Sequence, residues 1–516
     1  VFEHNSHGIR QRLRLFAAVE DPVKVVHVRL ENVWDRPRRI TATYFAEWVL
    51  GVSRDASQQY VIPEYDGETH ALLARNSYNS EFGGRLAFLA SSLAPHGLTA
   101  DRTEFLGRLG DRRRPAALQR IGLAGTVQPG TDPCAAIQVH IDLAPGEAAE
   151  FHFLVGQGDD RQAAMAAIQR YRTPESVAAA WNAVQERWDS LLGAVTVETP
   201  EPAMDIMLNR WLLYQSLSCR IWGRSGFFQS SGAFGFRDQL QDVLALLHTA
   251  PELARDQILR AAAHQFEEGD VLHWWHPPSG RGVRTHIADD LLWLPFVTAH
   301  YVETTGDESI LSEAAPYLRG DELAPGEDER YGHFETTEEV ASLYDHCRAA
   351  IRRASTRGSH GLPLMGGGDW NDGMNRVGIQ GKGESVWLGW FLYDTLTRFA
   401  AIAKLKGDIE SFDVWKAQAE ELQGALEKSA WDGDWYRRAY YDAGAPMGSR
   451  ESLECQIDSI SQSWAALSGA GDPERVRQAL TSVRQRLVRD EDRLILLLEP
   501  PFDRTPLDPG YIKGYP

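Results

Sequence analysis

Apolar and polar residues alternate along much of the first 160 residues, and this period of two is typical of strands with one buried face. The clearest strand candidates are Val26–Glu31, Ile40–Tyr44, Ile137–Leu143 and Phe151–Val155. A turn sequence at Ala144–Glu147 separates the last two. Because such strands bury their apolar faces most simply by packing two sheets together, the pattern predicts an antiparallel β-sandwich over residues 1–160.

The hydrophobic period changes to that of a helix at about residue 160. Thr173-Pro174-Glu175 combines an N-cap, a proline at the first helical position and an acidic first turn. The apolar residues of one helical stripe follow, namely Val177, Trp181, Val184, Trp188 and Leu191. We therefore expect a helical linker over residues 161–200.

Helical patterns dominate residues 201–516. Single apolar faces recur over Ala254–Gln265, Trp415–Leu426 and Val476–Leu487, as amphipathic helices require. Val386–Leu405 is apolar around most of its circumference, which indicates a helix with two buried sides. Because no parallel-strand pattern separates these helices, we expect an all-α toroid of paired helices in this part of the chain.

Composition supports a globular chain and narrows its partners. The 516 residues are 43% hydrophobic and 24% charged, which is enough apolar surface for a sizeable core. Lys plus Arg number 53 against 72 Asp plus Glu, a formal charge of -19. Nucleic acids and anionic membranes are held by clustered Lys and Arg, so this balance argues against both as partners.

The four cysteines lie far apart and form no CxxC pair, namely Cys134, Cys219, Cys347 and Cys455. We therefore expect free thiols in a reducing cytosol and no metal site. No apolar run approaches the roughly 20 residues that span a bilayer, and no signal-peptide pattern is visible. These features predict a cytoplasmic location.

Gly366–Asn375 is the most unusual stretch of the chain. Its four glycines let backbone approach a ligand closely, and they frame two carboxylates, an amide and an indole. Trp370 could form the floor under a sugar ring, while Asp369 or Asp372 donates a proton or binds hydroxyls. An Asx-rich turn that caps helices would use the same residue types, so both interpretations stay open.

A second candidate segment runs from Ser230 to Asp242. Arg237 and Asp238 lie where a loop meets a predicted helix, so they could present a guanidinium to an anion and a carboxylate to sugar hydroxyls. The alternative is an ordinary helix start, with Asp238 in its first turn and a local ion pair. Taken alone, the segment slightly favours this alternative.

The third candidate segment, Glu267–Asp290, concentrates His, Trp, Arg and Asp residues without the HExxH spacing of a zinc helix. Within it, Arg284 and His286 could donate hydrogen bonds to sugar hydroxyls. A surface loop with local ion pairs explains the same residues equally well.

Together the three segments resemble glycoside hydrolase family 94, the inverting phosphorylases that act on β-linked glucosides. The likeness is greatest to the phosphorylase-like module of cyclic β-1,2-glucan synthases and to 1,2-β-oligoglucan phosphorylases. It covers essentially the whole chain, from His4–Gly8 to Asp508–Pro516, with the three segments in the family's order. The resemblance implies a β-sandwich, a helical linker and an (α/α)6 barrel.

The resemblance also implies roles for individual residues. Asp372 matches the family's general acid, and Arg237 resembles an arginine that binds phosphate. Asp238 and Trp370 match residues that hold the glucosyl unit at the reacting subsite. The full predicted substrate-binding set is Asp238, Asp369, Trp370, Arg284 and His286.

We therefore expect inverting phosphorolysis of a β-linked glucan, β-1,2 in the first instance, to α-glucose 1-phosphate. Phosphate is already an anionic nucleophile, so the reaction needs no second carboxylate, and it needs no cofactor beyond phosphate as co-substrate. One alternative is an inverting hydrolase with Glu267, Glu268 or Asp270 as the base. The other is a non-catalytic glucan-binding module of a cyclic glucan synthase.

Both ends of the sequence look cut, because Val1 is not an initiator Met and Pro516 follows no helix cap. Family members place further phosphate ligands, a His and a Thr-Gly pair, after the point where this chain stops. We expect a piece of a longer protein whose barrel is incomplete at the C-terminus. The resemblance allows a larger synthase attached to the inner membrane, and a homodimer.

Overall fold

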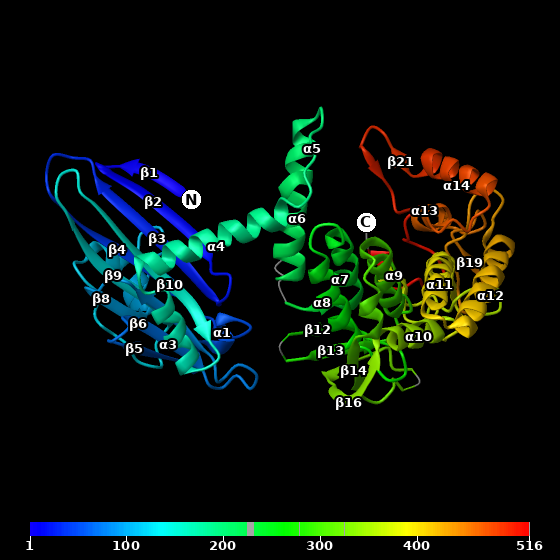
Figure 1. The fold of residues 1–516 in the computed structure, drawn as a ribbon, viewed down its shortest axis with the longest axis horizontal. Helices are drawn as coiled ribbons and strands as arrows, with labels where there is room; N and C mark the ends of the chain where they lie inside the picture. Colours follow the sequence, from blue (N-terminus) through cyan, green and yellow to red (C-terminus); the bar gives the residue numbers. More distant parts are fainter. Residues whose placement is uncertain (224–231, 278, 325, 515–516) are drawn as a thin grey trace. The chain divides into compact units, whose positions relative to one another are not determined.

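The computed structural model describes residues 1–516 except for 224–231, 278, 325 and 515–516. Ser230 and Ser231 of the second candidate segment, and the last two residues of the C-terminal motif, therefore lie outside the described residues. The chain divides into two units, Val1–Ser190 and Leu191–Pro516 (Figure 1).

Two antiparallel sheets form most of the first unit. The larger has seven strands in the order β1 (Phe2–Ser6), β2 (Ile9–Ala17), β3 (Val23–Asn32), β10 (Ala148–Gly158), β7 (Leu86–Ser91), β6 (Ala71–Asn76) and β5 (Val61–Asp66). The smaller has three, in the order β4 (Arg38–Glu47), β9 (Pro133–Leu143) and β8 (Gly97–Asp101). All four strand candidates from the sequence fall within these strands, and the predicted N-terminal sandwich is confirmed.

The main core of this unit lies between its two sheets, where Leu72 from the larger sheet and Ile137 from the smaller belong to one buried cluster. The other face of the larger sheet is covered by α3 (Arg161–Arg170) and α4 (Pro174–Leu192). Strand β6 is therefore buried on both faces. This explains why Ala71–Ala74 is apolar without interruption and shows no alternation in the sequence.

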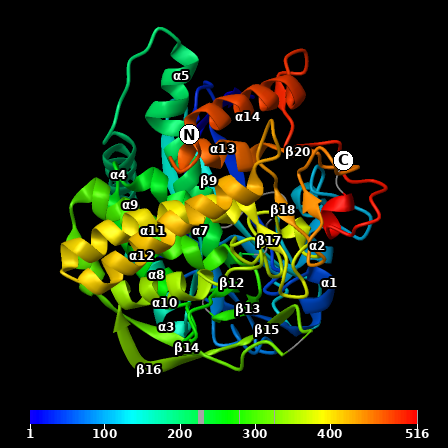
Figure 2. The ribbon, with the colours of Figure 1, turned by 90° about the vertical axis from the view of Figure 1, so that its right-hand side faces the viewer.

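Helices make up most of the second unit. They are α5 (Pro202–Ile206), α6 (Leu212–Ser216), α7 (Phe236–Val243), α8 (Pro251–Ala262), α9 (Trp293–Thr305), α10 (Leu343–Ala354), α11 (Val386–Lys406), α12 (Ile409–Ala425), α13 (Ser459–Leu467) and α14 (Pro473–Arg486). From α7 onward, consecutive helices contact each other in pairs, and α7, α9, α11 and α13 are also neighbours in succession. Figure 2 shows the pair α11 and α12 side by side.

The longest helix, α11, is buried on nearly every face. Ser385 is its N-cap and accepts a hydrogen bond from the Leu388 N–H at 3.0 Å, while Gly407 ends it in the left-handed conformation. Because α9, α12 and α13 all contact it, the two buried sides predicted for Val386–Leu405 are confirmed. Among the described residues, no helix combines the length and the apolar character needed to cross a bilayer.

The second unit also contains short antiparallel strands, which the expected all-α toroid lacked. One sheet has the order β11 (Phe234–Gly235), β12 (Leu272–His276), β13 (Arg281–Thr285) and β15 (Glu329–His333), and β14 (Ala314–Arg319) pairs with β16 (Glu335–Ser342). These strands have two to eight residues and lie in connections between helices, so the helical periodicity around them dominates the pattern. They position two candidate segments, because β11 leads into α7 and the third segment contains β12 and β13.

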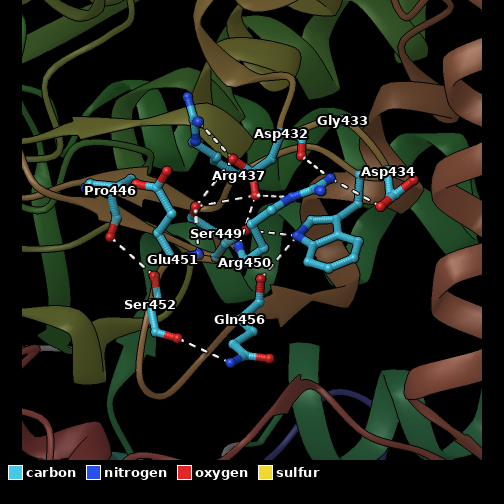
Figure 3. A network of polar contacts seen from close by, with 12 residues as sticks. Asp432, Gly433, Asp434, Arg437, Pro446, Ser449, Arg450, Glu451, Ser452 and Gln456 are labelled. Carbon is cyan, nitrogen blue, oxygen red and sulfur yellow. Dashed lines mark hydrogen bonds and ion pairs between the residues drawn. The ribbon is translucent and has the colours of Figure 1, made fainter.

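A network around Asp432 holds the loop that presents Arg438 (Figure 3). The nearly buried carboxylate of Asp432 accepts hydrogen bonds from Ser449 Oγ at 3.1 Å and from the Arg450 N–H at 2.7 Å. The main-chain N–H of Arg438 in turn donates to the Met447 carbonyl at 2.8 Å. The backbone of this arginine is therefore fixed independently of the contacts of its guanidinium.

The sandwich core should be sensitive to the loss of a single side chain. Ile137 is wholly buried between the sheets, so Ile137→Ala is expected to lower the free energy of unfolding of the first unit by about 3 kcal/mol. Ile121 is 85% exposed, so Ile121→Ala serves as the matched control and should change it by less than about 0.5 kcal/mol. Denaturant titration measures both, and equal effects would contradict the assigned core.

Candidate active site

Several helix starts and one glycine-rich turn bring charged residues of the second unit together. Arg237 lies in the first turn of α7, and Asp289 lies just before α9. Ser385 and Asp458 are the N-caps of α11 and α13. The turn is Gly366–Asn375, and side chains from these elements meet on it.

The glycines of the turn allow close contact with neighbouring backbone. The Gly367 N–H donates to the His286 carbonyl at 2.9 Å, and the Ala288 N–H donates to the Gly368 carbonyl at 2.9 Å. Gly366 has φ +57°, and a Cβ there would lie 2.3 Å from the His286 carbonyl oxygen. No other residue fits this position, because its conformation and its space both exclude a side chain.

Asp369 is the buried centre of the site. Its carboxylate accepts two hydrogen bonds from the Arg438 guanidinium and one from Ser385 Oγ, each at 2.6 Å, and both ionic side chains are 0% exposed. Burial raises the pKa of Asp369, but Arg438 and Ser385 outweigh it, and the pKa lies below its usual value. In this structure Asp369 therefore positions the turn and offers no exposed oxygen to a sugar hydroxyl.

Arg438 also approaches a second buried carboxylate. Its Nε lies 3.4 Å from Asp458 Oδ2, and Asp458 Oδ1 accepts a hydrogen bond from the Ile460 N–H at 2.9 Å. Burial raises the pKa of Asp458 to about 6, against the opposing effect of Arg438. One arginine thus ties the turn to the starts of α11 and α13.

Arg237 is the second buried arginine, and it reaches the exposed acid of the turn. Its Nη1 donates to both oxygens of Asp289 at 3.0 and 3.1 Å, and to the Asp369 carbonyl at 3.2 Å. Its Nη2 donates to Asp372 Oδ1 at 2.6 Å. The Arg237 side chain is 8% exposed and that of Asp372 is 34% exposed. The guanidinium therefore links a buried anchor to a carboxylate that solvent can reach.

Asp289 anchors Arg237 at the start of α9. Its side chain is 0% exposed, and its Oδ2 also accepts a hydrogen bond from Trp293 Nε1 at 3.0 Å. Burial raises the pKa of Asp289 to about 7, and Arg237 acts in the opposite direction.

His273 approaches the same acid from β12. Its Nδ1 lies 2.7 Å from Asp290 Oδ2, and its Nε2 lies 3.7 Å from Asp372 Oδ2. Burial lowers the pKa of His273, but Asp290 and Asp372 outweigh it and raise the pKa to about 9. The imidazole is therefore protonated at neutral pH, and each oxygen of Asp372 faces a cation.

Two further predicted residues lie beside this cluster in the chain. Trp370 is 41% exposed and stands two residues before Asp372. Asp238 follows Arg237 and is half-buried in the first turn of α7. A Cβ at Gly235 would lie 2.6 Å from Asp238 Oδ2, so the glycine gives this carboxylate its room.

Arg284 is buried and bonded to other protein groups. Its side chain is 1% exposed, and its five donor hydrogens are all engaged. Three bonds go to the carboxylates of Asp270 and Glu268, and two go to the carbonyls of Gly320 and Asp321. The predicted contact with sugar hydroxyls therefore has no donor available in this structure.

His286 lies at a cavity beside the turn. The cavity has a volume of about 480 Å³, and Gly366 and Gly367 form part of its wall. His286 is exposed there, while Leu291 and Leu388 supply apolar lining. An apolar lining with polar groups at its edge suits a ligand that carries hydroxyl groups on a hydrocarbon ring.

Sequence reasoning gave no individual role to His273, Asp289 and Asp290, although they lie in the third candidate segment. It missed Ser385, Arg438 and Asp458 altogether. One signal was present: the pair Asp289-Asp290 directly precedes the buried helix α9, where an uncompensated charge is costly. Nothing local marks Arg438, because its partner Asp369 is 69 positions away.

Comparison with known proteins gives matches along the whole chain. Residues 1–174 match the supersandwich domain of glycosyl hydrolase 94, and residues 187–516 match the catalytic domain of the glycosyl hydrolase 94 superfamily. The cyclic β-(1,2)-glucan synthase NdvB of Rhizobium meliloti is 46% identical over 497 residues, which are 96% of this chain and 18% of that protein. Solabiose phosphorylase of Paenibacillus borealis is 30% identical over 518 residues, 98% of this chain and 63% of that protein.

The chain thus spans less than two thirds of the length of either relative. Among solved structures, a bacterial glucoamylase complexed with acarbose superposes with a TM-score of 0.56 at 12% identity, over 93% of this chain and 66% of that one. At this identity the likeness concerns the fold alone.

The buried ion pair of the turn should contribute far more to the free energy of unfolding than an exposed pair of similar geometry. Asp369→Asn leaves the buried Arg438 without its main partner, so the free energy of unfolding of the second unit is expected to fall by about 3–5 kcal/mol. Asp490 also pairs with both terminal nitrogens of an arginine, Arg484, at 2.8 Å, but it is 72% exposed. Asp490→Asn should therefore cost less than about 1 kcal/mol, and a loss as large as that of Asp369→Asn would refute the argument from burial.

His273 should make the second unit less stable as the pH becomes alkaline. Because its pKa is raised from 6.5 to about 9, its contribution is complete below its ordinary pKa and is lost as pH rises through about 9. The difference in unfolding free energy between the wild type and His273→Gln should shrink by on the order of 3 kcal/mol between about pH 6 and about pH 10. Chemical denaturation across this range measures it, and a constant difference would contradict the charged state assigned to His273.

Proposed function

Since the chain belongs to the glycosyl hydrolase 94 superfamily, we propose that it carries out inverting phosphorolysis of a β-linked glucan. In this reaction phosphate attacks the anomeric carbon, α-glucose 1-phosphate forms, and the shortened glucan departs as an alcohol. The observation that carries the proposal is the Asp372 carboxyl, which is 34% exposed at the edge of an otherwise buried charge cluster. A proton donor needs this combination of solvent access and fixed position.

Asp372 is proposed as the general acid. It donates its proton to the glycosidic oxygen while an oxygen of hydrogen phosphate bonds to C1 on the opposite face of the ring. Hydrogen phosphate loses its own proton when it becomes the ester, so the proton that leaves with the alcohol is replaced without a net change. Phosphate is the nucleophile, and the protein needs no carboxylate to activate water.

Arg237 is proposed as a phosphate ligand through the part of its guanidinium that faces Asp372. Nη1 is held by Asp289 and by the Asp369 carbonyl, whereas among the described residues the hydrogen bond of Nη2 goes to Asp372. A phosphate oxygen at Nη2 therefore competes with Asp372 for the same nitrogen.

The sugar is proposed to lie on Trp370, with Asp238 binding its hydroxyls. The exposed indole offers an apolar face for the ring, and it stands two positions from the acid. The cavity at His286 is proposed to bind the part of the glucan that leaves as the alcohol. Gly366 and Gly367 line this cavity and belong to the same turn as Asp372.

A β-1,2 linkage is the proposed preference. Two similar proteins carry this linkage in their names, the cyclic β-(1,2)-glucan synthase and a 1,2-β-oligoglucan phosphorylase of Listeria innocua, which is 28% identical over 34% of this chain. The first of these covers nearly all of the present chain at 46% identity.

We also infer that helices α7 to α14 belong to an (α/α)6 barrel. The support is their arrangement as successive pairs, in which α7, α9, α11 and α13 are neighbours in turn. The starts of α7, α11 and α13 and the segment before α9 all contribute side chains to the same cluster, as the inner helices of such a barrel would.

A hydrolase is less well supported, because each base considered from the sequence is engaged in an ion pair. Glu267 pairs with Arg319, and both Glu268 and Asp270 pair with the buried Arg284. A carboxylate that activates water must be free to accept its proton.

A non-catalytic glucan-binding module is the second candidate function. It is favoured by the match to a cyclic glucan synthase, in which the similar region makes up 18% of the protein. A region of that kind could measure the length of a glucan by binding it, without catalysis. The two candidates share a glucan site and differ in the need for a proton donor.

Substitution of the acid separates these functions. In the full-length protein, Asp372→Asn is expected to lower the rate of α-glucose 1-phosphate release from β-1,2-oligoglucan and phosphate by about 10²- to 10⁴-fold, with glucan binding retained. Asp490→Asn, a surface carboxylate far along the chain, is the control and should keep the rate. Glucan binding by a wild type that forms no product would favour the module, and free glucose formed without phosphate would favour the hydrolase.

A further inference from the structure

One pair of side chains at the site has no part in the reaction described above. His273 lies on β12 and Asp290 lies at the start of the segment that leads into α9. The Asp290 side chain is 2% exposed and that of His273 is 18% exposed. Burying such a pair is costly unless each member compensates the other, so its presence behind the exposed acid calls for an explanation.

The geometry orders the three groups in a line from buried to exposed. Asp290 Oδ2 lies 2.7 Å from His273 Nδ1, and His273 Nε2 lies 3.7 Å from Asp372 Oδ2. The carboxylate at Nδ1 holds the ring with its other nitrogen toward the acid. The second separation exceeds hydrogen-bond length, so a proton transfer along it requires Asp372 Oδ2 to approach Nε2.

The charges around the imidazole favour its protonated form. Asp290 and Asp372 attract the proton, while Arg237, which pairs with Asp289 and Asp372, repels it. In the part of the chain that the structure describes, Asp290 Oδ1 has no hydrogen-bond partner and lies 4.0 Å from Arg237 Nη1. The imidazolium is therefore the main compensation for this buried carboxylate. The geometry and the raised pKa of His273, about 9, point in the same direction.

We propose that His273, held by Asp290, is the positioning residue that supplies Asp372 with its proton. The inference rests on the proposed function, since it assigns the source of the proton that Asp372 donates. It also explains why Asp372 faces a histidine on one oxygen and an arginine on the other. When Nη2 of Arg237 engages phosphate, His273 then keeps Asp372 in place.

The proton transfers balance over one cycle. The N–H bond at His273 Nε2 breaks and an O–H bond forms at Asp372 Oδ2, which leaves a neutral imidazole and a carboxylic acid. Asp372 gives this proton to the glycosidic oxygen as the C1–O bond breaks and the C1–O bond to phosphate forms. The proton lost by the hydrogen phosphate, on becoming an ester, restores the imidazolium through solvent.

The test uses the full-length protein, inorganic phosphate and two glucosyl donors. One donor is β-1,2-oligoglucan, whose leaving alcohol needs a proton, and the other is 2,4-dinitrophenyl β-glucoside, whose leaving group departs without one. His273→Gln is expected to lower kcat about 10- to 100-fold with the oligoglucan and to leave kcat with the activated donor within about threefold. A merely structural role would lower both rates together.

The pH profile gives a second, independent measurement. The wild type should keep kcat on the oligoglucan up to about pH 9, where His273 loses its proton. In His273→Gln, and to a smaller extent in Asp290→Asn, the alkaline fall should begin at lower pH, because Asp372 must then draw its proton from solvent. Asp290→Asn keeps the shape of the site, so it remains informative if His273→Gln folds poorly.

His264→Gln is the matched control. The His264 ring stacks on Trp275, which lies on β12 as His273 does, with the ring centroids 3.9 Å apart. None of the contacts of the His264 ring involves Asp372. Its pH profile should equal that of the wild type. Unchanged profiles in the His273 and Asp290 variants, or equal losses on both donors, overturn the inference while the proposed function stands. A wild type without phosphate-dependent product overturns the proposed function as well.

Discussion

The ion pair between Asp369 and Arg438 is the interaction on which the candidate site depends. Both side chains are wholly buried, so either charge would be strongly destabilising without the other. The pair also recruits Ser385, the N-cap of α11, and Arg438 reaches Asp458, the N-cap of α13. The turn that carries Asp372 is therefore fixed by groups that do not themselves need to meet a substrate. The position of Asp372 is thus set by a cluster that solvent does not reach. The cluster can be rigid while the Asp372 carboxyl itself stays accessible.

The same cluster limits which nucleophile the site can use. Its carboxylates outnumber its cations, the members being Asp289, Asp290, Asp369, Asp372 and Asp458 against Arg237, Arg438 and His273. Most of the carboxylate oxygens are engaged by these cations or by helix starts, so the cluster is not arranged to activate water. The excess of carboxylates also means that a phosphate dianion needs donors in addition to Arg237 to hold it.

The fold was largely predictable from hydrophobic period, and the centre of the site was not. Alternation identified β3, β4, β9 and β10 because polar side chains alternate with apolar ones along part of each. Ala71–Ala74 of β6 is buried on both faces and gave no such signal. Short strands such as β11, with two residues, lie below the length at which a period can be detected. The glycine-rich turn was recognisable by composition, but Arg438 pairs across 69 positions and has no local signature. Arg284, proposed from the sequence as a sugar ligand, has all its donors engaged by protein groups, which no local sequence signal indicated.

The segment from Thr285 to Ala288 has a consequence for how the two sides of the site communicate. Its main chain carries the turn, through the His286 carbonyl and the Ala288 N–H, and its side chains line the cavity of about 480 Å³. It continues directly into Asp289 and Asp290, which hold Arg237 and His273. One short stretch of chain therefore connects the cavity proposed for the glucan with the residues proposed for proton transfer. A ligand bound in the cavity would act on Arg237 and His273 through this same backbone segment, since Asp289 and Asp290 follow Ala288 directly.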